Sequence, residues 1–120
     1  MTDSVSEAGW TPASHRPGPS LYFEDLEAGR RYGLPSRTQT DALFAAFQLA
    51  SGDNDPIHYD RVYCQSVGHK DMLAHGMQVL IQSAAGAGTF PEDVAESLIG
   101  FIGLECKFLK PVYVGDTLYS

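Results

Sequence analysis

The sequence predicts a single domain of the α+β class, with helices in the middle of the chain and strands before and after them. Apolar residues recur at helical spacing over residues 42–50 and over about 76–86. Over residues 102–108 they alternate with small or polar residues, which is typical of a strand. A chain of 120 residues, of which 43% are hydrophobic, has room for one core and not for two.

Residues 1–20 precede the predicted domain, which spans residues 21–120. They are rich in Ser, Gly, Pro and Thr, and this composition indicates a flexible lead with Trp10 as its one bulky anchor. Residues 22–29 then read as an amphipathic bridge that ends in a glycine turn. Residues 31–40 alternate loosely and are predicted to form the first strand.

The first helix is predicted to lie between a capping residue and a glycine. Thr40 is of the type that caps helix N-termini, and Gly52 is of the type that ends helices. The apolar stripe between them consists of Leu43, Phe44, Phe47 and Ala50.

The second helix is predicted to begin at residues 75–77 and to run to about Gly86. Apolar residues occur all round it, as expected for a helix that is buried on most sides. Further along the chain, residues 112–114 resume a strand pattern after a proline, and residues 117–119 begin another strand after a turn.

Charge and cysteine content exclude several functions. Lys plus Arg total 8 and Asp plus Glu total 15, so the formal net charge of −7 disfavours nucleic-acid binding. Cys64 and Cys106 show neither paired-cysteine nor zinc spacing, so no disulfide framework or structural zinc is expected. Residues 1–19 lack the apolar run of a signal peptide, and no stretch approaches a membrane span. We therefore expect a cytoplasmic location.

The polar segment 51–60 is the first place to look for chemistry. It carries Asp53 and His58 with Pro56 between them, and a turn at the proline brings the two side chains together where a continuous helix would not. An Asp with a His makes a simple acid–base pair. The alternative is an ordinary surface turn stabilised by the Asp53 side chain.

A metal site in the same segment is the weaker hypothesis. Asp53, Asp55, His58 and Asp60 all offer ligand atoms within eight residues. The spacing lacks the terminal glutamate of a calcium loop, and no second His or Cys lies nearby in the sequence. We expect no metal.

The predicted start of the second helix, residues 74–77, is the other candidate. The first N–H groups of a helix have no intrahelical acceptor, and Gly76 lets a substrate oxygen approach them, as an oxyanion hole for a thioester carbonyl requires. The alternative interpretation is that Gly76 only allows close packing of the helix. His75 either makes a structural hydrogen bond or lines the site, and Met77 has the character of a packing residue.

Two motifs stand in sequence order and are more specific together than either is alone. The first is Phe47-x-x-Ala50-Ser51-Gly52-Asp53-x-x-Pro56-Ile57-His58-x-Asp60, and the second is Ala74-His75-Gly76-Met77. Together they resemble the MaoC-like dehydratase family, which includes the (R)-specific enoyl-CoA hydratases. The resemblance covers the chain from about Tyr22 to Leu118.

This resemblance implies a fold and a site. The fold is the hot-dog fold, a curved antiparallel sheet wrapped around one long central helix, here Gly76 to about Gly88, in subunits that usually dimerise. In the family, the Asp and His that match Asp53 and His58 activate a water for addition to a 2-enoyl thioester. The glycine that matches Gly76 polarises the thioester carbonyl. The family uses no cofactor.

The resemblance also carries expectations about the surroundings of the site. The neighbouring residues Asp55, Ile57, His75 and Met77 are expected to bind substrate, which is an acyl-CoA or another acyl thioester. Asp55 stands where the family motif commonly has Asn, and its carboxylate is expected to raise a local pKa by charge repulsion. The family fold usually continues with further strands, so a missing tail or a homodimer is expected to complete the sheet.

Two other functions remain open from the sequence. One is a hot-dog acyl-CoA thioesterase, which would share the fold and the helix-start oxyanion site. The other is a non-catalytic subunit that binds acyl-CoA beside an active partner.

Overall fold

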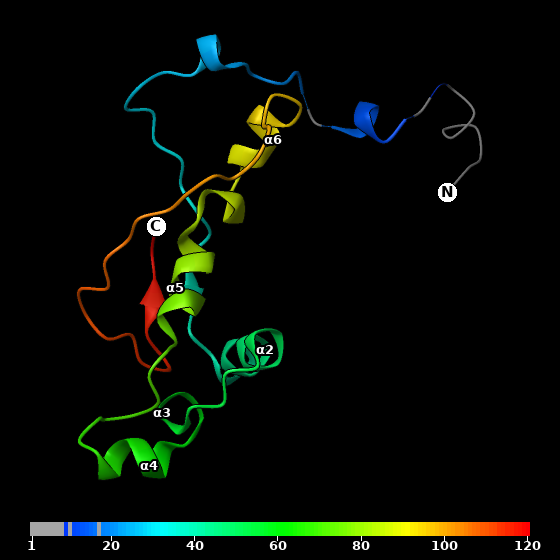
Figure 1. Ribbon diagram of the computed structural model, residues 1–120. Coiled ribbons are helices and arrows are strands. Elements are labelled where there is room, and N and C mark those ends of the chain that lie inside the picture. The colour runs from blue at the N-terminus through cyan, green and yellow to red at the C-terminus, as the bar shows by residue number, and fades with distance from the viewer. Residues whose placement is uncertain (1–8, 10, 17) are drawn as a thin grey trace.

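The computed structural model describes residues 9, 11–16 and 18–120 (Figure 1). The predicted anchor Trp10 lies outside the described residues. The elements in chain order are η1 (Ala13–His15), η2 (Phe23–Asp25), β1 (Arg37–Thr38), α2 (Asp41–Ser51), α3 (Pro56–Tyr59), α4 (Arg61–Ser66), α5 (Gly76–Ser83), η3 (Ala85–Ala87), α6 (Phe90–Val94) and β2 (Thr117–Leu118). Helix and sheet are both present, as the sequence predicts.

Helix α2 forms where its stripe and caps predict it. The Thr40 hydroxyl accepts a hydrogen bond from the Leu43 N–H at 3.3 Å, which satisfies one of the free donors at the helix start. Gly52 ends the helix in the left-handed conformation, with φ of 71°, which a residue with a side chain rarely adopts. The apolar stripe then places Phe44 in the interior, where only 2% of it is exposed.

Two short helices follow because aspartates cap each of them. The Asp55 carboxylate accepts from the Ile57 N–H at 3.0 Å, and Pro56 occupies the first turn of α3. The Asp60 carboxylate then accepts from the Tyr63 N–H at 2.9 Å and starts α4. The polar segment is therefore a turn followed by one helical turn, and it points His58 back across the chain.

The core is small and lies between α2, α4 and the segment before α5. Phe44, Cys64 and Met72 form its buried centre. The partly buried residues that pack against this centre are Ile57, Tyr59, Ala74 and Val114. Cys64 is buried and Cys106 is exposed, and the two are not joined by a disulfide.

Strand pairing is limited to short stretches. β1 and β2 pair antiparallel, with Arg37 opposite Leu118 and Thr38 opposite Thr117. A separate bridge joins Leu73 to Tyr113 and holds the chain just before α5. The predicted strands at 31–40 and 117–119 are thus confirmed only as the two-residue cores of β1 and β2.

Helix α5 begins at the predicted residue but is shorter than predicted. It ends at Ser83, because Ala84 turns to an extended conformation with ψ of 154°. It is also not buried all round: Ile81 is 55% exposed, while Gln78 is 2% exposed. The buried side chain of α5 is therefore a polar one, and its amide donates a hydrogen bond to Gln39 Oε1 at 3.1 Å. Among the described residues, the apolar side chains of α5 do not fill a core.

The predicted strand at 102–108 is wrong for this structure. Residues 100–109 run as an irregular segment between α6 and β2 (Figure 1). Ile99 and Ile102 are fully exposed, and Phe101 is 81% exposed. Alternation supplies a face to bury, but a strand also needs a neighbouring strand for its backbone hydrogen bonds, and the described residues offer none there.

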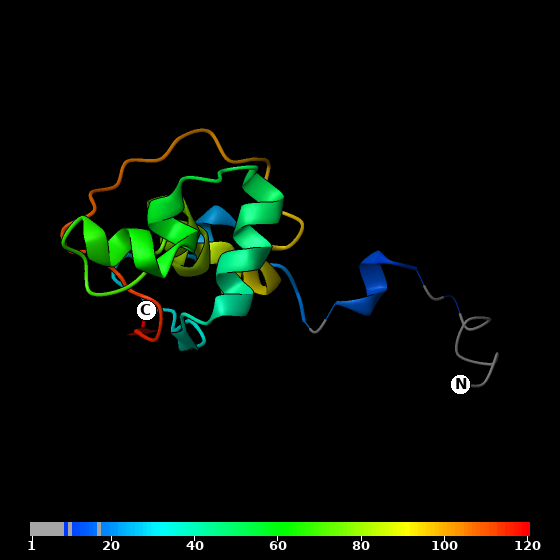
Figure 2. The ribbon, with the colours of Figure 1, turned by 90° about the horizontal axis from the view of Figure 1, so that it is seen from below.

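The chain is more extended than a compact domain of its length. Its Cα radius of gyration is 19.4 Å, whereas about 14 Å is typical for a compact chain of 120 residues. Residues 11–16 extend away from the helices in both views (Figures 1 and 2). Among the described residues, no helix has the length and apolar character needed to cross a bilayer.

Candidate active site

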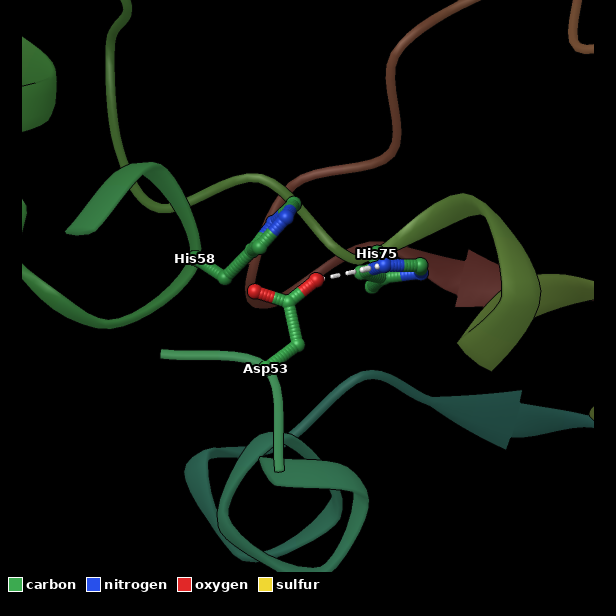
Figure 3. A group of neighbouring side chains, drawn as sticks. All are labelled: Asp53, His58 and His75. Atoms are coloured by element: carbon green, nitrogen blue, oxygen red, sulfur yellow. Dashed lines mark ion pairs between the residues drawn. The ribbon is translucent and has the colours of Figure 1, made fainter. Parts of the chain in front are cut away.

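Three side chains from separate elements meet at one point. Asp53 follows the glycine that ends α2, His58 lies in α3, and His75 precedes the first residue of α5. One ligand atom of each lies within 4.8 Å of the corresponding atoms of the other two. All three side chains are partly buried, and they converge in Figure 3. The structure thus brings three sequence-predicted site residues together: Asp53, His58 and His75.

The backbone segment that precedes α5 in the sequence orients His58. Its Nδ1 lies 2.8 Å from the carbonyl oxygen of Leu73, which accepts hydrogen bonds and does not donate them. Nδ1 therefore carries the proton, and Nε2 keeps a free lone pair in the neutral ring. Leu73 is itself fixed, because its N–H donates to the Ile57 carbonyl at 3.1 Å.

Asp53 is held as a carboxylate. The backbone N–H of Asp55 donates to Asp53 Oδ1 at 3.0 Å and is the main cause that lowers the pKa of Asp53 below its ordinary 3.8. Burial opposes this shift, and the nearby His75 and His58 rings lower the pKa further. The expectation that Asp55 raises the local pKa is therefore wrong for Asp53, whose pKa is lowered chiefly by the hydrogen bond from the Asp55 backbone N–H.

The Asp55 side chain has a structural task of its own as the cap of α3. Asn and Asp cap helices about equally well. We therefore predict that Asp55→Asn leaves the thermal unfolding midpoint within about 2 °C and changes any turnover by less than about threefold. Calorimetry and initial rates check this. A larger loss of turnover with an unchanged midpoint would instead support the expected substrate-binding role of Asp55.

The remaining sequence-predicted site residues lie around this group. Ile57 packs against the core, and the Met77 N–H donates to His75 Nδ1 at 3.1 Å while its side chain is 46% exposed. Neither residue lines the described cavities. Their expected contact with substrate stays a prediction.

Gly76 is one of the residues that line an apolar groove of about 370 Å³. The groove is lined by Ala74, Gly76, Val79, Phe108, Leu109, Lys110, Pro111 and Val112. A Cβ on Gly76 would lie 3.0–3.3 Å from the Phe108 ring, so the glycine permits this close packing. As the first residue of α5, Gly76 has an N–H with no intrahelical acceptor. His58 lines a second, smaller hollow of about 220 Å³ between α2 and α3.

Two contributors to this region carry no signal in the sequence. The Leu73 backbone carbonyl orients His58, and backbone atoms leave no mark on residue patterns. The hydroxyl of Tyr59 is buried. Burial raises the pKa of Tyr59, and the negative charge of Asp53 is the second cause, which places the hydroxyl within electrostatic reach of the site.

The hydrogen bonds favour an acid–base group over a metal site. Because Met77 N–H donates to His75 Nδ1, the neutral ring carries its proton on Nε2, and this atom faces Asp53 Oδ2 at 2.8 Å. A metal at this position would require a lone pair on the same Nε2. The donor set therefore fits a metal poorly.

A family model described as the MaoC-like domain matches residues 25–120. The chain belongs to this family. It is 30% identical over 101 residues to an (R)-specific enoyl-CoA hydratase of Rhodospirillum rubrum, and the match covers 81% of this chain and 65% of the relative. A second relative with that name, from Aeromonas caviae, is 29% identical over 97 residues, which are 78% of this chain and 66% of the relative.

Comparison with a solved structure supports the arrangement of the chain. The monoamine oxidase regulatory protein from Archaeoglobus fulgidus superposes with a TM-score of 0.75 at 29% identity, over 83% of this chain and 67% of that protein. The matches to the two curated hydratases cover just under two thirds of the length of those proteins.

Proposed function

We propose that this MaoC-like protein adds water to the double bond of a 2-enoyl-CoA and, in reverse, dehydrates a 3-hydroxyacyl-CoA. The observation that carries the proposal is the convergence of Asp53 and His58 with His75, the residue that directly precedes Gly76 at the start of α5. The names of the two curated relatives support the same reaction class.

In the proposed reaction, the free Nε2 of His58 takes a proton from a water molecule that the Asp53 carboxylate holds. The water oxygen bonds to C3, and the electron pair of the double bond moves through C2 onto the thioester oxygen. The Gly76 N–H donates to this oxygen as its negative charge develops. His58 then returns the proton to C2, so that one water has been added across the double bond.

The groove beside Gly76 supplies a place for the acyl chain. Its walls are largely apolar, with Val79, Phe108 and Pro111 among them, and Lys110 is its one charged residue. A thioester carbonyl placed at the Gly76 N–H would direct its acyl chain along these walls. Of the other basic residues near the site, Arg61 already pairs with Asp71 at 2.7 Å.

The hot-dog fold is part of the proposal. In a complete sheet wrapped around α5, the exposed apolar residues of segment 98–109 would gain partners. The five most exposed of these are Leu98, Ile99, Phe101, Ile102 and Leu109. We propose that a second copy of the chain contributes to this cover, since exposed apolar area of this extent is uncommon in monomers. Light scattering of the purified chain would show a dimer, and a monodisperse monomer would contradict the proposal.

The test of the function is a short-chain 2-enoyl-CoA offered to the purified protein. Hydration removes the ultraviolet absorbance of the enoyl thioester and releases no free thiol. Release of thiol would support the thioesterase alternative, and binding without either change would support a non-catalytic acyl-CoA-binding subunit.

A further inference from the structure

We propose that His75 is a positioning residue that locks the Asp53 carboxylate to the N-terminus of α5. This inference rests on the proposed function, because it assigns His75 the task of holding the two halves of the thioester site in one geometry. The sequence left His75 between a structural hydrogen bond and substrate binding, and the contacts of its ring favour the former.

Both ring nitrogens of His75 are already engaged within the chain. Nδ1 accepts from the Met77 N–H at 3.1 Å and thereby caps α5. Nε2 lies 2.8 Å from Asp53 Oδ2 and donates its proton to that oxygen. With both nitrogens occupied, the ring has no donor or acceptor left for a substrate.

The His75 ring also packs against two other rings. The centroids of the Phe47 and His58 rings each lie 4.9 Å from the centroid of the His75 ring. One quarter of the His75 side chain is exposed. Packing of this kind limits ring rotation, so the hydrogen bond to Asp53 keeps one direction.

The consequence is a fixed relation between two functional groups from different elements. Asp53 receives one hydrogen bond from the Asp55 backbone and one from His75, so its carboxylate plane is set. The residue that sets it is also the cap that starts the helix at Gly76. A small shift of either group in a thioester site lowers the rate, and this shared support prevents independent shifts.

The arrangement gives His75 and His58 opposite tautomers. His75 carries its proton on Nε2, whereas His58 carries its proton on Nδ1, where the Leu73 carbonyl accepts it. The two neutral rings therefore differ in which nitrogen is free, and His58 alone retains an unpaired Nε2. This difference is measurable without any substrate.

The first experiment reads the tautomers directly. ¹⁵N-labelled full-length protein is examined at neutral pH by long-range ¹H–¹⁵N correlation of the imidazole rings, and resonances are assigned by single His→Asn variants. We expect the Nε2–H form for His75 and the Nδ1–H form for His58. An Nδ1–H form of His75, or rapid exchange between its two forms, would overturn the proposal.

The second experiment separates positioning from folding. Asn at position 75 can still cap α5 but cannot also reach Asp53, so His75→Asn is expected to keep the unfolding midpoint within about 2 °C. We expect kcat for a short enoyl-CoA to fall at least about tenfold with KM changed less than about twofold. His69→Asn is the matched control, because His69 contacts Tyr113 away from the site, and it should leave both constants unchanged.

The outcomes of the two experiments are separable. A raised KM with unchanged kcat in His75→Asn would assign His75 to substrate binding and overturn the positioning role. Absence of hydration by the unaltered protein would overturn the proposed function, and the tautomers would still decide whether His75 makes its two hydrogen bonds.

Discussion

Replacing His58 by Gln is expected to lower kcat/KM for enoyl-CoA hydration by about 100- to 10,000-fold. Gln has a similar length and can donate to the Leu73 carbonyl, but it offers no nitrogen that takes a proton from water. Asp53→Asn is expected to cause a loss of the same order, because the neutral amide neither holds the water as a carboxylate does nor accepts as well from His75. Initial rates with a saturating series of a short enoyl-CoA measure both effects.

His58→Gln and Asp53→Asn together test whether these two side chains carry out the proposed hydration. Asp55→Asn is the control, since it alters a neighbouring carboxylate that caps α3 and does not join the group of three. If His58→Gln and Asp53→Asn both kept kcat/KM within about twofold, the proposed chemistry would be wrong. Midpoints of thermal unfolding, measured alongside, ensure that a loss of rate is not a loss of fold.

The pH dependence of Asp53 has a definite sign. Its pKa is lowered on folding, so its contribution to stability is fully present above the ordinary value of 3.8 and is lost as the pH falls through the lowered value. The difference in unfolding midpoint between the unaltered chain and Asp53→Asn should therefore be constant at neutral pH and shrink below pH 3.8. A difference that shrank already near neutral pH would contradict a lowered pKa.

Replacing Phe44 by Ala is expected to lower the free energy of unfolding by about 3–5 kcal/mol. Phe44 is 2% exposed and forms the centre of the small core with Cys64 and Met72. Because few other apolar side chains are buried, the truncation removes a large fraction of the apolar surface that folding buries. Urea unfolding followed by circular dichroism measures the change in midpoint and slope.

Leu49→Ala provides the matched control on the same helix. Leu49 is 88% exposed, and the change from Leu to Ala is compatible with a helix, so we expect a change within about 0.5 kcal/mol. Equal effects of the two substitutions would show that Phe44 is not the centre of the core. A loss confined to Phe44→Ala also predicts a loss of activity, because α2 carries Asp53 at its end.

Local rules were sufficient for the elements around the site. Thr40 and Gly52 delimit α2 because capping depends on a few neighbouring atoms. The same is true of the start of α5 at Gly76 and of the turn that carries His58. The sequence therefore indicated where Asp53, His58 and Gly76 stand along the chain, and the structure brings Asp53 and His58 together.

Pairing between distant segments lay beyond those rules. The alternation over 102–108 was correctly read as apolar on one face, yet no described segment pairs with it, and the predicted strand does not form. Likewise, the apolar residues of α5 predicted a buried helix, whereas the side chain it buries is Gln78, hydrogen-bonded to Gln39. A residue pattern specifies which side chains an element can bury. It does not specify which other segment of the chain packs against them.

By itself, then, the sequence determined the family motifs, the bounds of α2, the start of α5 and the identity of an Asp–His pair, since these depend on short stretches of chain. The tertiary structure alone decided that His75 bonds to Asp53, that the Leu73 carbonyl orients His58, and that the Asp55 backbone lowers the pKa of Asp53. The physical reason is that hydrogen bonds and electrostatic fields depend on distances between atoms, and folding brings together at 2.8 Å atoms that are 22 residues apart in the chain.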